Sequence, residues 1–177
     1  FYNTMFAAMP RQTAAQAYRA YMGLDIARQQ GLLPVENEPV DYDAKGVEEA
    51  ECAQCHSTLD PLSYPFAYYN GIGDGPSAAY NEQRPVLKGL WGPDEKPQGL
   101  LFGTPVEDLV EWAQLAANSA QFQRQMALLF YQHAMGHGPR PEDLEEFIAL
   151  WESIPGDNYN ANALNHRLID LMAFGGP

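Results

Sequence analysis

The chain has 177 residues, of which 46% are hydrophobic and 19% charged, a composition typical of a folded globular protein. Its 23 acidic side chains outnumber the 10 lysines and arginines, which gives a formal net charge of −13. Because such a surface repels phosphate groups, the charge argues against nucleic-acid binding and against adhesion to anionic membranes. No apolar run approaches the roughly 20 residues of a membrane-spanning helix, so we expect no span.

The pattern predicts a mostly α protein, a single domain over residues 1–177 with three parts. We expect an N-terminal helix and arm over residues 1–46, with Thr13 and Gln16 as the candidate capping box of a helix over about 14–29. Residues 47–103 begin with a short helical turn and continue, from about residue 71, as a long irregular segment rich in glycine and proline, with strand-like alternation only over 85–90. Such a segment is usually functional or packed over another part of the molecule or a bound group.

Residues 104–177 are expected to form a helical part. Thr104, Pro105 and Glu107 predict the N-cap, first-turn proline and capping acid of a helix that ends near residue 117. Three further helices are expected over about 119–135, 141–153 and 160–174, the first of them ended by Gly136.

Both cysteines of the chain lie in one motif, Cys52-Ala53-Gln54-Cys55-His56. This spacing is that of c-type haem attachment, in which two thioether bonds tether the porphyrin and the adjacent histidine approaches the iron. The motif therefore predicts one covalent haem c, with His56 as an axial ligand. Attachment normally takes place outside the cytoplasm, so we expect an exported protein on the periplasmic or extracellular side of a bacterial envelope. A chain that starts at Phe1 is then either a mature protein or a piece of a longer one.

Three other interpretations of the cysteines stay open. A disulfide between Cys52 and Cys55 would close a very small loop and stabilise little. A thioredoxin-like redox pair expects a βαβ context, which the surrounding pattern does not supply. A zinc site built from both cysteines with His133 and His137 has the right ligand types, but it leaves the adjacent His56 as a coincidence.

The sixth iron ligand decides between electron transfer and catalysis. On the predicted helix over 119–135, His133 shares one apolar stripe with Phe122, Met126, Leu129, Phe130 and His137. We expect it either as the distal ligand or as a core histidine bonded to a carbonyl. Met135, on the opposite side of the helix, is the alternative distal ligand, because Met/His ligation is common in cytochromes c.

The sequence after the motif carries a family resemblance. The motif followed by Leu59-Asp60-Pro61-Leu62, Phe66, Tyr69 and Gly71 resembles the haem module of the planctomycete-type cytochrome c family, whose members are large exported bacterial proteins. The stretch His133-Ala134-Met135-Gly136-His137 is similar to the family's Tyr-Ala-Leu-Gly-Arg-like helix end, with histidines in place of Tyr and Arg. The resemblance implies a cytochrome-c-like haem-binding helical domain, here the C-terminal haem portion of a larger protein or assembly.

The residues that follow the motif have expected roles of their own. We expect Pro61, Phe66 and Tyr69 to help bind the haem, the aromatic rings packing either its edge or the core. Asp60-Pro61 is expected as a turn that redirects the chain after the motif. Arg84 and Lys88 are candidate partners of the haem propionates, because basic residues are scarce.

These observations favour a monohaem electron-transfer protein that serves a redox partner protein or a larger electron-transfer complex, and an acidic surface suits a basic partner. The alternative is a peroxidase-like haem enzyme with an open distal site, in which His133 or His137 would act as acid or base. A third interpretation is a structural or assembly subunit in which the haem stabilises a loop-rich fold.

Overall fold

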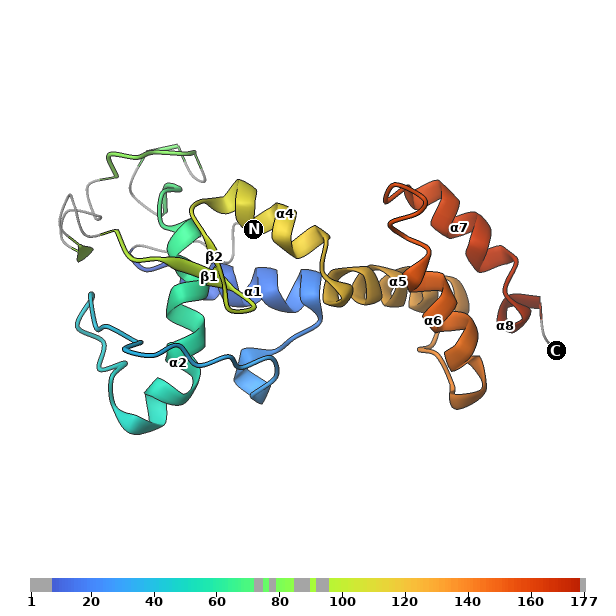
Figure 1. The fold of residues 1–177 in the computed structure, drawn as a ribbon, viewed down its shortest axis with the longest axis horizontal. Coiled ribbons are helices and arrows are strands. Elements are labelled where there is room, and N and C mark those ends of the chain that lie inside the picture. Colours follow the sequence, from blue (N-terminus) through green and yellow to red (C-terminus); the bar gives the residue numbers. More distant parts are fainter. Residues whose placement is uncertain (1–7, 72–74, 77–78, 85–89, 92–95, 176–177) are drawn as a thin grey trace. The chain divides into compact units, whose positions relative to one another are not determined.

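The computed structural model describes residues 8–71, 75–76, 79–84, 90–91 and 96–175 and is mostly helical, as predicted (Figure 1). Its backbone contacts divide the chain into two compact units. Unit 1 comprises Phe1–Ala20 and Leu24–Leu115, and unit 2 comprises Tyr21–Gly23 and Ala116–Pro177. The helical part expected from residue 104 is therefore shared between the units.

Unit 1 begins with two helices where one was expected over 14–29. Helix α1 (Arg11–Met22) ends before Gly23, whose φ of 68° lies in the left-handed region that glycine adopts without strain. The short η2 (Ile26–Arg28) follows, and the Asp25 carboxylate caps it by accepting from the Ala27 N–H. The motif helix α2 (Ala50–Ser63) and η3 (Tyr64–Phe66) come next.

A hairpin lies where the sequence predicted a helix start. Strands β1 (Gly99–Leu101) and β2 (Thr104–Val106) are antiparallel. Phe102 and Gly103 join them with φ values of 53° and 76°, as in the two-residue turns that match the twist of a hairpin. The prediction that Thr104 caps a helix was therefore wrong. Helix α4 (Leu109–Ala117) begins later, and the Asp108 carboxylate accepts from the N–H groups of its first turn.

The core of unit 1 is rich in aromatic rings. Tyr64, Tyr42 and Trp91 form a group of edge-to-face contacts with centroids 5.6–6.1 Å apart. Arg84 is fully buried and donates to the carbonyls of Ala8 and Ala67, at 3.2 and 3.0 Å. Its guanidinium thus has a structural role, and Lys88 lies outside the described residues.

Unit 2 is a small helical assembly that the sequence predicted closely. It contains α5 (Ala120–Met135), η4 (Pro141–Asp143), α6 (Leu144–Glu152), α7 (Ala161–Ile169) and α8 (Met172–Gly175). Ser119 caps α5, Gly136 ends it with a φ of 75°, and Asn160 caps α7. Two helices occupy the stretch expected as one helix over 160–174. Helix α7 ends at Ile169, and α8 begins at Met172.

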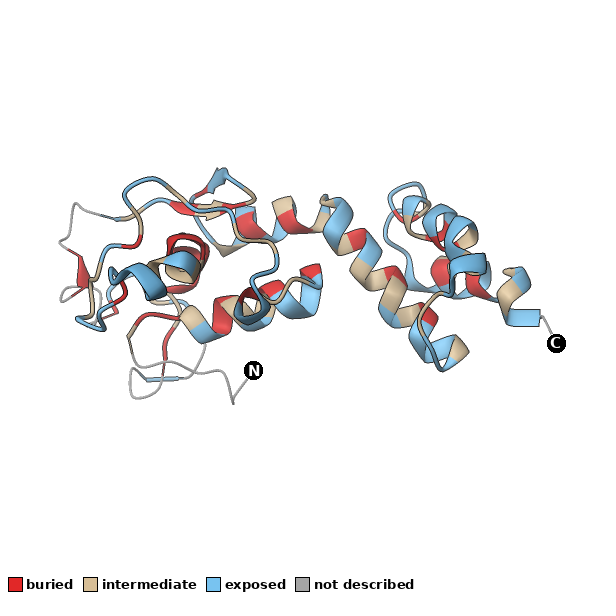
Figure 2. Ribbon diagram, turned by 90° about the horizontal axis from the view of Figure 1, so that it is seen from below, coloured by how far each residue is buried: buried red, intermediate tan, exposed pale blue. Residues whose placement is uncertain are grey.

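The buried positions of α5 recur along the helix between exposed and partly buried ones (Figure 2). They are Gln123, Ala127 and Tyr131, which differ from the apolar stripe predicted to include His133. Ala127 and Tyr131 pack with Phe147, Leu150, Ile154, Leu164 and Leu168. None of the helices in the described part of the chain combines the length and the apolarity that crossing a membrane requires.

Candidate haem-attachment site

The three motif side chains project from one side of the first turns of α2. Cys52, Cys55 and His56 stand at positions i, i+3 and i+4 of the helix, which are neighbours on its surface. Cys52 is exposed, Cys55 is half-buried, and the side chain of His56 keeps 23% of its surface accessible. The expected short turn is thus the start of a fourteen-residue helix.

Burial changes along α2 in a way that leaves the motif accessible. The first two turns are exposed or partly exposed, whereas residues 60–63 and the η3 segment after them are buried in unit 1. Both thiols are free, with no disulfide between them. A long contact of 3.8 Å links Cys55 Sγ to the carbonyl of Ile26 in η2. Both sulfurs can therefore react with a ligand brought to this face.

The imidazole of His56 is oriented by a hydrogen bond to a buried carboxylate. His56 Nδ1 lies 2.8 Å from Asp60 Oδ1, one helical turn further along α2. Asp60 is 0% exposed, and an ionised carboxylate only accepts hydrogen bonds, so Nδ1 carries the proton in this contact. The other ring nitrogen, Nε2, is then the one left with a lone pair for a metal.

Arg11 of α1 completes this arrangement. Its guanidinium donates to both oxygens of Asp60, from Nε and Nη2, each at 2.8 Å. The third nitrogen, Nη1, donates to both oxygens of Asp43 at 2.9 Å. Burial acts to lower the pKa of Arg11, but the hydrogen bonds to Asp60 and Asp43 outweigh it and the net pKa is raised. Arg11 is therefore charged, and it compensates a carboxylate whose burial alone would be costly.

The expected turn at Asp60-Pro61 is absent, because both residues are inside α2. A proline within a helix cannot donate to the carbonyl four residues earlier, which here belongs to Ser57. The Val35 N–H supplies the missing hydrogen bond at 3.1 Å, and Leu33 N–H donates to the neighbouring Thr58 hydroxyl at 2.9 Å. The loop before the motif thus supplies the hydrogen bond that Pro61 cannot make to the Ser57 carbonyl. Helix α2 continues, and Asp60 lies one turn after His56, within hydrogen-bond distance of its ring.

The other residues expected to bind haem have protein contacts in unit 1. Pro61 is fully buried. Phe66 packs edge-to-face on Trp112, with centroids 5.4 Å apart. Tyr69 packs against Tyr80 and pairs with it in an isolated β-bridge. Core packing accounts for the Phe66 ring, whereas Tyr69 is only partly buried. Contact of either ring with a haem stays a prediction.

The candidate distal ligands belong to unit 2, whereas His56 belongs to unit 1. His133 is exposed on α5, so the interpretation as a core histidine was wrong. Met135 is partly buried against the core of unit 2 together with Leu128, on the side of the helix that the sequence predicted. His137 is exposed, and its ring nitrogens form hydrogen bonds with the Gly138 carbonyl and the Arg140 guanidinium. A role of His133 or Met135 at the iron stays a prediction.

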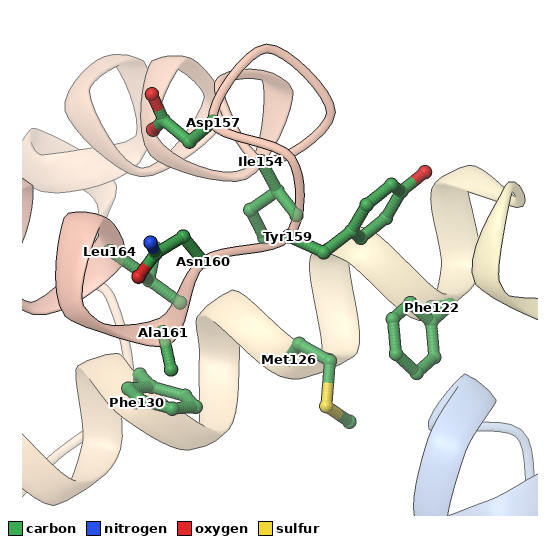
Figure 3. A pocket seen from close by; sticks show the side chains of 9 residues that line it. All are labelled: Phe122, Met126, Phe130, Ile154, Asp157, Tyr159, Asn160, Ala161 and Leu164. Carbon is green, nitrogen blue, oxygen red and sulfur yellow. The ribbon is translucent and has the colours of Figure 1, made fainter.

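A hollow of about 200 Å³ in unit 2 is lined mainly by apolar side chains (Figure 3). Phe122, Met126 and Phe130 of α5 line one side, and the segment before α7 lines the other with Tyr159 and Asn160. It holds none of the motif residues. Among the residues that the structure describes, no three or more histidine, cysteine or acidic side chains are grouped so that they could hold a metal ion. The zinc interpretation joins Cys52 and Cys55 of unit 1 with His133 and His137 of unit 2, and it stays a prediction.

The donor set at the start of α2 fits a covalent haem. Two free thiols are neighbours on one accessible face, and an imidazole beside them is oriented through its Nδ1. Sequence reasoning missed Arg11, Asp43 and the role of Asp60. The spacing of His56 and Asp60, four residues apart, was the available signal, but the proline after Asp60 predicted a turn. Comparison of the chain with protein-family models, curated proteins and solved structures gave no match.

Proposed function

We propose that this chain is a monohaem c-type cytochrome that acts in electron transfer. The observation that carries the proposal is the accessible face of α2, where Cys52, Cys55 and His56 stand together with Nδ1 of the histidine fixed by Asp60. Two thioethers and one imidazole are the protein groups that hold a haem c, and the haem supplies one-electron chemistry when bound. We further propose an exported protein, as a subunit or C-terminal portion of a larger assembly.

The charge around the motif supports a positively charged redox partner. Residues 36–51, which lead into the motif, contain seven carboxylates and a single lysine. Glu48, Glu49 and Glu51 are exposed beside Cys52. A surface of this sign attracts a basic protein and accelerates encounter at low ionic strength. We therefore expect the reduced protein to react faster with cationic hexaammineruthenium than with anionic hexacyanoferrate, after correction for driving force, and the difference to shrink with added salt.

The test is maturation of the full chain in a bacterial host that exports it and carries a c-type haem attachment system. We expect a mass increase of one haem that survives denaturation, and sharp low-spin bands in the reduced spectrum. Cys52→Ala and Cys55→Ala should each retain a single thioether, and the double variant none. His166→Ala, at an exposed histidine of α7, is the matched control for His56→Ala and should leave the spectrum unchanged. A wild-type chain without covalent haem would overturn the proposal and favour zinc.

The same spectra address the sixth ligand. A weak sulfur-to-iron charge-transfer band in the oxidised protein, lost in Met135→Leu, would assign Met135. A low-spin spectrum without this band, converted to high spin in His133→Ala, would assign His133.

A second candidate function is a peroxidase-like enzyme, and the His56–Asp60 contact is the observation that favours it. A carboxylate partner makes an axial imidazole a stronger electron donor, and electron donation from the axial ligand favours O–O cleavage. The bidentate Arg11 contact withdraws part of that charge, which favours electron transfer. High-spin ferric iron that reacts rapidly with hydrogen peroxide would establish the enzyme, and six-coordinate iron inert to peroxide would exclude it.

A further inference from the structure

We propose that Asp60 and Arg11 form a positioning pair that sets the reduction potential of the iron bound by His56. The inference rests on the proposed function, since it concerns the haem that the motif would hold. It assigns a role to two residues outside the motif. Asp60 is in the same helix as His56, and Arg11 is in a different helix, 45 positions before His56 in the sequence.

The first step is the orientation of the ring. His56 and Asp60 are one turn apart on α2, so the helix itself fixes the distance between them. Asp60 cannot move toward another partner, because Arg11 holds both of its oxygens. The hydrogen bond from Nδ1 selects one tautomer and presents Nε2 to the iron, as partners of ligating histidines do at other metal sites.

The second step is electronic. A carboxylate that accepts the Nδ1–H increases the basicity of the imidazole. A more basic ligand stabilises ferric iron relative to ferrous iron, because the oxidised ion carries the greater charge, and the potential falls. Asp60 is fully buried, so water does not screen this effect as it would at the surface.

The third step is the opposing charge of Arg11. Its guanidinium withdraws electron density from Asp60 through two parallel hydrogen bonds, an arrangement stronger than a single contact. Arg11 also binds Asp43, so its charge is shared between two carboxylates. The two members of the pair therefore act on the iron in opposite directions, Asp60 lowering the potential and Arg11 raising it.

The test is the midpoint potential of the haem-loaded full chain in three variants. Asp60→Asn keeps an acceptor for Nδ1 but removes the charge, and we expect the ferrous form to gain about tenfold in the equilibrium, a rise of about 59 mV for a one-electron couple. Arg11→Gln should shift the potential in the opposite direction. Arg11→Lys, which restores the charge without the bidentate contact, should recover part of that shift.

Asp43→Asn is the matched control within the same cluster. It removes one negative charge that Arg11 binds, but Asp43 makes no hydrogen bond to His56. We expect a clearly smaller shift than for Asp60→Asn. Equal shifts in the two variants would show that the general field of the cluster acts on the iron, and would overturn the proposal.

The outcomes separate this inference from the proposed function. Absence of covalent haem in the wild-type chain refutes the function and the inference with it. Haem attached in the wild type, but with shifts of the same sign in Asp60→Asn and Arg11→Gln, refutes the inference alone. If Asp60→Asn fails to fold, Asp60→Glu with Arg11→Gln carries the test, together with the nitrogen chemical shifts of His56 in the ferrous wild-type protein, which must report a protonated Nδ1.

Discussion

Replacing Tyr64 with phenylalanine removes one hydroxyl from the core of unit 1. That hydroxyl donates to Glu38 Oε2 at 2.8 Å, and the buried ring contacts Tyr42 and Trp91. Because phenylalanine keeps the ring contacts, the variant isolates the hydrogen bond. Such a bond contributes about 1.5–3 kcal/mol when the acceptor is charged and about 0.5–1.5 kcal/mol when it is neutral. We therefore expect the free energy of unfolding to fall by about 2 kcal/mol where Glu38 is ionised and by about 1 kcal/mol where it is protonated.

Glu38 gives this loss its direction with pH. Burial raises the pKa of the Glu38 carboxyl above its usual value, while the hydrogen bonds from Tyr64 and from the Val40 N–H act to lower it. A carboxyl whose pKa is raised on folding contributes stability below its unfolded pKa and loses it as the pH rises through the folded pKa. Removing the Tyr64 hydroxyl raises the pKa of Glu38 further, so the loss in Tyr64→Phe must grow as the pH rises.

The assay is guanidinium unfolding from about pH 5 to about pH 8, followed by tryptophan fluorescence. A Trp151→Phe background removes the tryptophan of α6, so that the signal comes from unit 1, where Trp91 lies beside Tyr64. In a Glu38→Gln background the loss caused by Tyr64→Phe should no longer depend on pH. A loss that stays constant with pH in the wild-type background, or that shrinks as the pH rises, would refute the reasoning.

Three further predictions concern the thiols and unit 2. In haem-free protein, Cys52 is exposed and Cys55 half-buried, so iodoacetamide should label Cys52 first, as peptide mapping would show; equal labelling would contradict the described burial. Leu150→Ala should lower the stability of unit 2 by about 2–5 kcal/mol because it opens a cavity in a buried cluster, and Trp151 fluorescence should report the change; Leu144→Ala, at an exposed leucine of the same helix, is the control. Ser119→Ala should cost about 1 kcal/mol by removing the cap of α5, and Ser119→Asp, which keeps an acceptor, should cost less; chemical unfolding that ranks the two variants the other way would argue against the cap.

Local chemistry made unit 2 predictable. Ser119, Gly136 and Asn160 act as caps in the structure because a capping residue satisfies backbone groups within its own turn, and this information is contained in a few adjacent residues. The hairpin was missed because its turn contains Phe102 at a positive φ, a conformation that a bulky residue adopts only when the packing of the flanking strands enforces it.

The Cys52–His56 motif consists of five adjacent residues, so the chemistry expected of its two thiols and its histidine could be predicted without any structure. The contacts that fix His56, in contrast, depend on how α1 and α2 pack in unit 1. A proline after Asp60 predicts a turn, and α2 continues through it because Val35, 22 residues before Ser57, donates to the Ser57 carbonyl that the proline leaves free. The continued helix buries Asp60, and a buried carboxylate requires a cation, which Arg11 of α1 supplies. Contacts between segments so distant in the chain depend on how those segments pack, and no local pattern encodes them.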